Sequence, residues 1–251
     1  MTVVLVRHGE SDFNREHRFC GWLNGQLTAK GREEAIQAGQ ALSADGIRFQ
    51  RAFCSVLDRS IDSLNLMLET LNLEWIEVVK DWRLNERHYG ELQAQSKIDS
   101  IHAYPKDKLY EWRRSFEGCP PRLAWDDPMH PRFDPRYRTL DAEMLPAGES
   151  LAMTQVRVLA CFDELIRPCL NRHENVLVSL HANSMRALLQ TLLNTPPETI
   201  DDLYIPTGVP LVLNDVKGEF VTRYLGDEAL IRQNIRKQKD NVALLGKKNL
   251  R

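Results

Sequence analysis

Cysteine is scarce in this sequence, and the few cysteines form no pattern. The 251 residues include five, at positions 20, 54, 119, 161 and 169, and no two of them make a C-x-x-C pair. Disulfide frameworks and structural zinc sites need closely and regularly spaced cysteines. We therefore expect reduced thiols, buried in a core or lying on the surface, and a protein of a reducing compartment.

Long apolar runs and an excess of one charge are also missing. No stretch approaches the roughly 18 apolar residues that cross a membrane, and the apolar run at residues 2–6 is too short for the core of a secretory signal. With 33 Lys and Arg against 35 Asp and Glu, the net charge is -2, which leaves no general basic surface for nucleic acid or an anionic membrane. We expect a cytoplasmic protein that binds neither.

What the sequence does contain is an alternation of short apolar runs and segments with helical spacing. The apolar runs predict buried strands, at residues 2–6, 52–55, 75–79 and 176–180. Apolar residues spaced by three and four predict helices, after Thr28, over 57–71 and over 185–192. Strands that alternate with helices predict a three-layer α/β/α fold with a mainly parallel, mixed central sheet. Two more apolar segments predict a closing hairpin, at residues 210–216 and 219–224.

Residues 90–148 break this alternation. The segment has seven prolines, several aromatic residues and many charges, but no sustained apolar period. We expect one domain over residues 1–251, in which 90–148 is a long excursion over the active site. A further core-facing helix is predicted around 159–170, with Pro168 bending or closing its last turn. The basic segment 240–251 is expected to be a mobile tail.

Basic side chains lie at the predicted ends of several strands. His8, in the run Arg7-His8-Gly9-Glu10, follows the first strand, and His181 follows the strand at 176–180. Arg59 begins the helix after another strand. Taken singly, each has an ordinary explanation, as a loop histidine bonded to backbone or a solvated helix charge. Because the carboxyl ends of parallel strands meet at one edge of a sheet, we expect the three to converge on one ligand.

This combination of side chains suits phosphoryl transfer. Charge in the transition state rests on three oxygens, and arginine binds such oxygens bidentately while it stays charged. A neutral histidine can attack phosphorus and so divide one displacement into two. Arginines that neutralise the phosphate make a metal unnecessary, and the remaining histidines show no metal-binding spacing. The residues therefore favour metal-free transfer through a histidine.

The motifs resemble those of a known family. Arg7–Glu10, together with His181–Ser184, is similar to the histidine phosphatase superfamily. Leu84–Gly90, Trp112–Arg114 and Pro206–Pro210 then resemble the cofactor-dependent phosphoglycerate mutases, in the order of that family. The similarity of pattern covers the chain from about residue 3 to 226, and implies the mutase-like form of the three-layer fold.

The resemblance implies a catalytic role for five residues. His8 would be the nucleophile that becomes phosphorylated. Arg7, Arg59 and His181 would surround the phosphoryl group in transfer. Glu86 would be the general acid and base at the substrate hydroxyl, although the residues alone leave open a surface ion pair with its neighbour.

The resemblance also implies a set of substrate-binding residues. Those near the transferring phosphoryl group would be Ser11, Asn14, Cys20, Gly21, Ala182 and Asn183. Those that hold the phosphate and carboxylate of the substrate would be Arg87, Tyr89, Lys97, Arg113 and Arg114. Without the resemblance, the paired arginines beside Trp112 could be a snorkelling surface pair, but the cost of burying them unpaired favours an anionic ligand.

Two positions depart from the family pattern. Cys20 stands where many mutases have Thr or Ser, and a thiol is the weaker hydrogen-bond donor. Ala182 replaces the usual glycine and adds a methyl group near the phosphate. We expect modest tuning from both. Gly21 argues against the bisphosphoglycerate mutase branch, which tends to have serine there.

The activity implied by the resemblance is that of a 2,3-bisphosphoglycerate-dependent phosphoglycerate mutase, an isomerase of glycolysis and gluconeogenesis. Such an enzyme interconverts 3-phosphoglycerate and 2-phosphoglycerate through phosphohistidine, needs 2,3-bisphosphoglycerate as primer and uses no metal. The resemblance also suggests a homodimer or dimer of dimers, and a lid role for the basic tail. The alternatives are a bisphosphoglycerate synthase/phosphatase or general phosphomonoesterase on the same scaffold, and a non-catalytic phosphate-binding relative.

Overall fold

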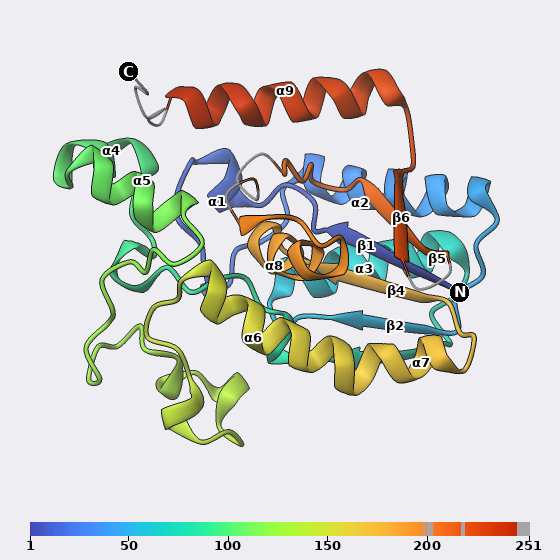
Figure 1. Cartoon of the computed structure of the whole chain (residues 1–251), viewed down its shortest axis with the longest axis horizontal. Coiled ribbons are helices and arrows are strands. Elements are labelled where there is room, and N and C mark those ends of the chain that lie inside the picture. Colours follow the sequence, from blue (N-terminus) through green and yellow to red (C-terminus); the bar gives the residue numbers. More distant parts are fainter. Residues whose placement is uncertain (198, 200–202, 217–218, 245–251) are drawn as a thin grey trace.

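The computed structural model describes residues 1–197, 199, 203–216 and 219–244, which fold around one six-stranded sheet (Figure 1). The strands are β1 (Thr2–Arg7), β2 (Arg51–Cys54), β3 (Glu77–Lys80), β4 (Val176–Leu180), β5 (Pro210–Val216) and β6 (Glu219–Tyr224). Their order is β3-β2-β4-β1-β5-β6, in which the first four run parallel and the last two pair antiparallel. The predicted hairpin is therefore present, and its residues Lys217 and Gly218 lie outside the described residues.

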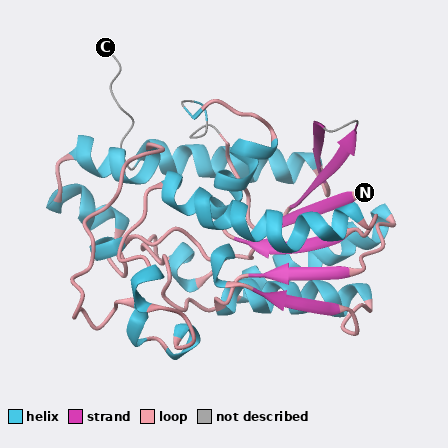
Figure 2. Cartoon of the chain, turned by 60° about the horizontal axis from the view of Figure 1, so that its bottom comes forward, coloured by secondary structure: helices cyan, strands magenta, loops and turns pink. Residues whose placement is uncertain are grey.

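Helices cover both faces of the sheet, as Figure 2 shows. On one face lie α2 (Ala29–Asp45) and α3 (Asp58–Leu71), packed on the even-numbered side chains of β1, such as Val4. On the other lie α6 (Leu151–Cys161), α7 (Arg167–Asn171) and α8 (Ala182–Leu192), packed on the odd-numbered side chains, such as Leu5. Alternate residues of a strand point to opposite faces, so the continuous apolar run of β1 serves two cores. The predicted three-layer α/β/α fold is confirmed.

Local sequence sets the bounds of the predicted helices. Thr28 begins α2, because its side chain accepts the Gly31 N–H, and Asn72 ends α3 in the left-handed region with φ 54°. The strand predicted at 75–79 begins two residues later, at Glu77. The reason is that β3 is an edge strand, and Trp75 is 79% exposed before it.

The helix predicted around Pro168 is longer than expected. It runs as α6, a π-helical turn at Phe162–Ile166, and α7. Proline has no N–H to donate to the preceding turn, and its ring crowds the carbonyl there. The widened turn lies directly before α7, so the chain adapts ahead of Pro168 and the helix continues to Asn171.

The excursion 90–148 contains only short elements. Its helices are α4 (Lys97–Ala103) and α5 (Lys106–Arg114). The chain also has the short α1 (Asp12–Arg15) and five 3-10 turns, at Trp82–Leu84, Gly90–Leu92, Pro131–Phe133, Pro135–Tyr137 and Ala142–Met144. The first part of the excursion packs through a small cluster, Phe19, Leu92 and Leu109. The later part packs through a second cluster, Trp22, Tyr137 and Leu145.

The first residues of the expected C-terminal tail are helical. A helix, α9 (Glu228–Leu244), includes residues 240–244 of the expected tail and lies along the side of the molecule that also holds α2 (Figure 1). Residues 245–251 lie outside the described residues. All five cysteines are free, and all but Cys119 are buried. Among the residues that the structure describes, no helix combines the length and apolar character needed to span a bilayer.

Candidate active site

The candidate site lies where three neighbouring parallel strands end. His8 follows β1, Ser55 follows β2 and His181 follows β4. Because β4 lies between β2 and β1, His181 has a neighbour on each side. The ring centroids of His8 and His181 are 4.9 Å apart, and Ser55 Oγ is 2.8 Å from His181 Nε2. All three side chains are buried, at 3%, 0% and 0% exposure for His8, Ser55 and His181.

The hydrogen bonds of His8 fix which ring nitrogen carries the proton. Its Nδ1 lies 2.7 Å from the Gly9 carbonyl oxygen, which can only accept, so Nδ1 carries the proton. The lone pair is therefore on Nε2, where the Arg59 Nε–H donates at 3.2 Å. Burial holds the pKa of His8 well below its usual value, and the charges of Arg59 and Arg7 lower it further. His8 is therefore a neutral ring whose unprotonated nitrogen is Nε2.

The loop that carries His8 approaches α2 very closely. A Cβ atom on Gly9 would collide with the Gly31 carbonyl oxygen, and a Cβ atom on Gly31 would collide with the Glu10 carbonyl oxygen. The Gly9 N–H also donates to Ser63 Oγ on α3, at 3.0 Å. Because neither glycine has a side chain, the loop packs closely against α2 and hydrogen-bonds to α3, and these contacts fix the position of His8 at the end of β1.

Arg59 is held by the loop that follows Cys20. Its Nη1 donates to the Leu23 carbonyl oxygen and its Nη2 to the Gly21 carbonyl oxygen, both at 2.9 Å. Gly21 has φ +56°, a conformation that other residues adopt with strain. With Nε on His8 and both Nη atoms on carbonyls, the guanidinium has a single orientation.

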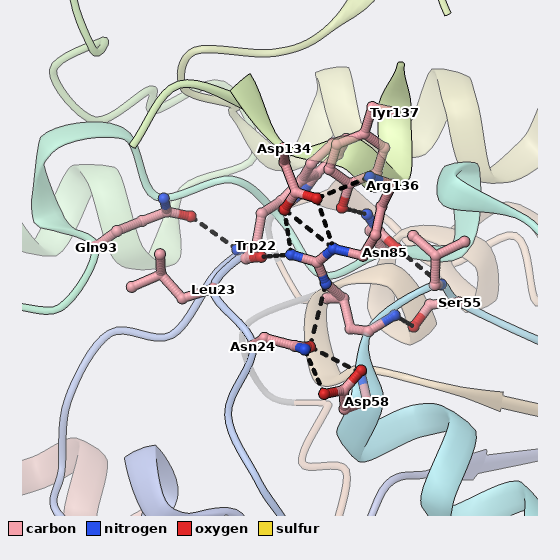
Figure 3. Close-up of polar contacts among 12 residues, drawn as sticks. Trp22, Leu23, Asn24, Ser55, Asp58, Asn85, Gln93, Asp134, Arg136 and Tyr137 are labelled. Carbon is pink, nitrogen blue, oxygen red and sulfur yellow. Dashed lines mark hydrogen bonds and ion pairs between the residues drawn. The ribbon is translucent and has the colours of Figure 1, made fainter. Parts of the chain in front are cut away.

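That loop is in turn anchored to the excursion (Figure 3). Arg136 Nη1 donates to Asn24 Oδ1 at 3.1 Å, and Nη2 to the Trp22 carbonyl oxygen at 3.5 Å. Asn24 Oδ1 also accepts the backbone N–H of Asp58, at 2.9 Å, directly before Arg59. Both the backbone and the guanidinium of Arg59 are therefore positioned through the loop that Arg136 holds.

Glu86 also lines the cavity. Its Oε1 accepts the backbone N–H groups of Arg87, at 2.8 Å, and Asn183, at 3.1 Å. Its backbone carbonyl accepts from Arg157 Nη2 at 2.9 Å, and Arg157 forms a buried ion pair with Glu149. Within the described part of the chain Oε2 accepts no hydrogen bond, so one carboxylate oxygen is held and the other is available to a ligand.

The cavity is about 440 Å³ in volume and strongly cationic. Burial lowers the pKa of Lys97 to about 8, with Arg113 and Arg7 adding to the effect. Burial also lowers the pKa of Arg7, while the charge of Glu86 opposes the shift. Arginines and lysines outnumber carboxylates among the lining residues, and the cavity therefore favours an anion with charge at more than one point.

Most of the residues expected from the sequence line this cavity. They are Arg7, His8, Asn14, Cys20, Gly21, Arg59, Glu86, Tyr89, Lys97, Arg113, Arg114, Ala182 and Asn183. Cys20 Sγ donates to the Leu23 carbonyl oxygen at 3.3 Å, and burial raises the pKa of its thiol. The cysteine therefore lines the site as an unreactive, loop-bonded group.

Three expected residues lie behind the lining. Ser11 is fully buried and begins α1, where its hydroxyl accepts the Asn14 N–H at 3.3 Å. Arg87 lies with its guanidinium 4.8 Å from the Tyr89 ring centroid, and its Nη2 donates to a backbone carbonyl at 3.1 Å. His181 lies behind His8. Direct contact of Ser11 and Arg87 with a ligand remains a prediction, although neither residue belongs to the lining of the cavity.

Other residues that line the cavity were not expected from the sequence. The additional residues are Glu10, Arg15, His17, Arg18, Phe19, Lys30, Glu34, Arg186, Tyr204, Thr207 and Asn234. Arg186 had a signal, since it follows Asn183 by one helical turn and its Nη1 donates to Asn183 Oδ1 at 3.2 Å. Asn234 had none, because it comes from the unexpected helix α9. Across the described residues, no group of three or more His, Cys, Asp or Glu is arranged to hold a metal ion.

Comparison with known proteins places the chain in a family. The sequence profile of the histidine phosphatase superfamily (branch 1) matches residues 3–227. The 2,3-bisphosphoglycerate-dependent phosphoglycerate mutase of Lachnoclostridium phytofermentans is 41% identical over 239 residues, which is 94% of this chain and 96% of that protein. The protein of the same name from a Hydrogenobaculum species is 42% identical over 236 residues, 93% of this chain and 96% of that protein.

Solved structures show the same fold. A phosphoglycerate mutase from Bacillus anthracis superposes with a TM-score of 0.65 at 20% identity, over 93% of this chain and 96% of that one. A mycobacterial glucosyl-3-phosphoglycerate phosphatase gives 0.66 at 23% identity, over 89% and 96%. The chain therefore belongs to the histidine phosphatase superfamily, and within it to the family of 2,3-bisphosphoglycerate-dependent phosphoglycerate mutases.

Proposed function

We propose that this protein is a phosphoglycerate mutase that interconverts 3-phosphoglycerate and 2-phosphoglycerate through a phosphohistidine at His8. The observation that carries the proposal is the state of His8, a neutral ring with its proton fixed on Nδ1 and its Nε2 lone pair facing Arg59. Identity of 41–42% to relatives that carry this activity in their names supports the same substrates.

The residues fit 2,3-bisphosphoglycerate as the primer. Arg7 Nε, Arg87 Nε and His181 Nδ1 are buried nitrogen atoms without a hydrogen-bond partner in the described protein, and a phosphate offers acceptors to such groups. Lys97, Arg113 and Arg114 add positive charge to the cavity. When bound, the primer supplies the phosphoryl group that loads His8. The arginines provide the charge neutralisation, and we propose that no metal takes part.

His8 and Glu86 would share the chemistry. His8 Nε2 forms a bond to phosphorus as the phosphate–oxygen bond breaks, and Arg59 and Arg7 stabilise the charge on the transferring oxygens. Glu86 returns a proton to the oxygen that leaves. In the reverse direction Glu86 accepts the proton of the substrate hydroxyl as that oxygen takes the phosphoryl group from His8. The free Oε2 of Glu86 is the atom proposed for both transfers.

The test is covalent labelling. Incubation with 32P-labelled 2,3-bisphosphoglycerate should leave a label that acid removes and alkali does not, as expected for a phosphorus–nitrogen bond on histidine. His8→Ala should abolish the label, whereas His102→Ala, an exposed histidine of α4 outside the cavity, should keep it. Unlabelled wild-type protein would contradict every histidine-phosphate activity, the phosphatase alternative included.

Mutase and phosphatase activities are then separated on one preparation. Water that reaches phospho-His8 would release inorganic phosphate in place of transferring the group. We expect interconversion of the two phosphoglycerates to exceed hydrolysis of the bisphosphate by at least about 100-fold, because a discrimination of roughly 3 kcal/mol is modest for a closed charged site. Hydrolysis as fast as interconversion would favour a bisphosphoglycerate phosphatase.

The cellular setting follows from this activity. We infer a place in glycolysis and gluconeogenesis, a cytoplasmic location and a homo-oligomeric assembly, either a dimer or a dimer of dimers. The partners are small phosphoglycerates, with no nucleic acid or membrane involved. Gel filtration with light scattering would test the assembly, and a monomer at micromolar concentration would contradict it.

A further inference from the structure

Ser55 contacts the active site without reaching the cavity. It follows β2, is 0% exposed and does not belong to the cavity lining. Its hydroxyl has two partners, the backbone N–H of Leu57 at 3.2 Å and His181 Nε2 at 2.8 Å. The shorter of these contacts joins a serine to a histidine in the interior of the protein, where a hydrogen bond is expensive to leave unmade.

The two contacts determine the direction of the Ser55–His181 hydrogen bond. A backbone N–H only donates, so the Ser55 oxygen accepts from Leu57. If His181 Nε2 also donated, the hydroxyl proton of Ser55 would have no acceptor among its partners. If Ser55 donates to Nε2, its proton and its oxygen are both used. The second arrangement leaves no buried hydroxyl proton unpaired and is therefore favoured.

We propose that Ser55 is a positioning residue that holds His181 in the tautomer with its proton on Nδ1. The ring then presents an N–H donor that has no acceptor in the described protein, since His181 Nδ1 is buried without a hydrogen-bond partner. The missing acceptor would be an oxygen of the phosphoryl group transferred at His8, whose ring is the neighbour of His181. In this last step the inference rests on the proposed function.

The same tautomer then serves two different purposes in the adjacent rings. His8 has Nδ1–H bonded to the Gly9 carbonyl, which leaves the lone pair of Nε2 for attack on phosphorus. His181 has Nε2 bonded to Ser55, which leaves Nδ1–H for donation. One ring is left with a nucleophile and the other with a hydrogen-bond donor, and the difference lies only in which nitrogen the protein occupies.

Charge explains why the tautomer needs to be fixed. Burial holds the pKa of His181 well below its usual value, and the positive charge of Arg59 lowers it further. A charged imidazolium would donate from both nitrogens, but a neutral ring donates from one. His181 therefore works as a donor only if its single proton is on the nitrogen that Ser55 does not occupy.

The first test examines the unliganded wild-type protein. Nitrogen-15 labelled histidine distinguishes protonated from unprotonated ring nitrogens in two-bond proton–nitrogen NMR spectra, and the His181→Asn variant assigns the signals. We expect His181 to show a protonated Nδ1 and an unprotonated Nε2 at neutral pH. A proton on Nε2 in the wild-type protein would overturn the proposal, with no dependence on how any variant folds.

The second test removes the hydroxyl. In Ser55→Ala, the His181 signals should shift towards a mixture of the two tautomers, and the rate of His8 phosphorylation should fall by about 3- to 10-fold, as expected for one neutral hydrogen bond. Ser55→Thr keeps a hydroxyl and should retain the wild-type tautomer. Unchanged His181 signals and rate in a folded Ser55→Ala protein would overturn the proposal.

A matched control is available in the first turn of α3. Ser60 is also 0% exposed, and its hydroxyl donates to the Ser179 carbonyl oxygen at 2.8 Å without contact to either histidine. Ser60→Ala removes a buried hydroxyl of the same kind, and should leave the His181 tautomer and the phosphorylation rate within about twofold of wild type. An equal loss in both variants would assign the effect of Ser55 to general destabilisation.

The outcome also separates this inference from the proposed function. A wild-type protein with Nδ1–H on His181 but no phosphohistidine label would contradict the function and leave the tautomer assignment standing. A wild-type protein that labels on His8 but has its His181 proton on Nε2 would contradict only the role of Ser55.

Discussion

Two groups of residues that line the cavity are supported by hydrophobic clusters of very different size. One group, here called the reaction wall, consists of His8, Arg59 and Glu86. His8 follows β1 and Arg59 lies in the first turn of α3, and the apolar side chains of these two elements belong to the large clusters on the sheet faces. The other, the binding wall, consists of Lys97, Arg113 and Arg114 on the short helices α4 and α5. Those helices rest on a much smaller cluster, Phe19, Leu92 and Leu109.

The difference follows what each wall does. Bond formation depends steeply on the placement of the reacting atoms, so a rigid support is needed for His8 and Arg59. Attraction between a cation and a carboxylate or phosphate tolerates small movements, so a thinner support is sufficient for Lys97. Substitutions in the reaction wall should therefore lower kcat, and substitutions in the binding wall should raise KM.

The largest expected effect is in the reaction wall. Glu86→Gln keeps the shape of the side chain but removes its ability to take up and return a proton, so kcat should fall by about 10²- to 10⁴-fold with a much smaller change in KM. The exposed Glu91→Gln is the control and should behave as wild type. A kcat within threefold of wild type would remove Glu86 from the proposed chemistry.

The binding wall is tested by Lys97→Met. Loss of a charged hydrogen bond to the substrate should raise KM by about 10- to 100-fold, while kcat changes less. A fall in kcat with an unchanged KM would break the distinction between the two walls.

Lys97 also gives the binding wall a pH dependence. Its pKa is lowered to about 8, so the ammonium charge is present below this pH and is lost above it. The value of kcat/KM should therefore decline as the pH rises above about 8. Lys97→Arg stays charged and should carry the plateau to higher pH. The same decline in both proteins would assign it to another group.

A smaller effect should connect the excursion to the reaction wall. Arg136 forms an ion pair with Asp134 and holds the loop that orients Arg59 (Figure 3). Arg136→Ala should lower kcat by about 3- to 10-fold, since it removes hydrogen bonds but no reacting group. The control is Arg138→Ala, an exposed arginine two residues away. An increase in KM alone would mean that the later excursion serves the binding wall.

The smallest effect is expected at Cys20. A hydroxyl is a stronger donor than a thiol of the same reach, so Cys20→Ser should leave kcat within about twofold of wild type, most simply with a slight increase. Steady-state rates of both directions measure it. A tenfold loss would show that the thiol itself is required in the cavity.

The fold was predictable where the pattern is local and regular. The continuous apolar run of β1 and the regular spacing of apolar residues from Leu57 to Leu71 in α3 identify these elements, because each pattern extends over most of its element. The edge strand β3 was placed two residues early, since only one of its sides pairs. Helix α9 was missed, because its described residues include a single buried apolar side chain, Ile231.

The residues of the site were predictable for a different reason from the elements of the fold. His8 and His181 could be predicted because strand ends of a parallel sheet meet, and the family motifs supplied the cations of the binding wall. The sequence could not show which of the expected residues line the cavity, and Arg87, which was expected to hold the substrate, lies outside the lining with its guanidinium 4.8 Å from the Tyr89 ring centroid. Partners such as Arg136 and Asn24 are 112 residues apart and have no local signal.

The contact between Gly9 and Gly31 has a consequence for anyone who alters this protein. The backbone of the loop that carries His8 contacts the backbone of α2 with no side chain between them. A Cβ atom on either glycine would collide with the backbone of the other segment. The position of His8 Nε2 thus depends on α2, which contributes neither of the two histidines. Variants of α2 designed for solubility or thermal tolerance should keep Gly31, because even an alanine there would push the backbone of the His8 loop away.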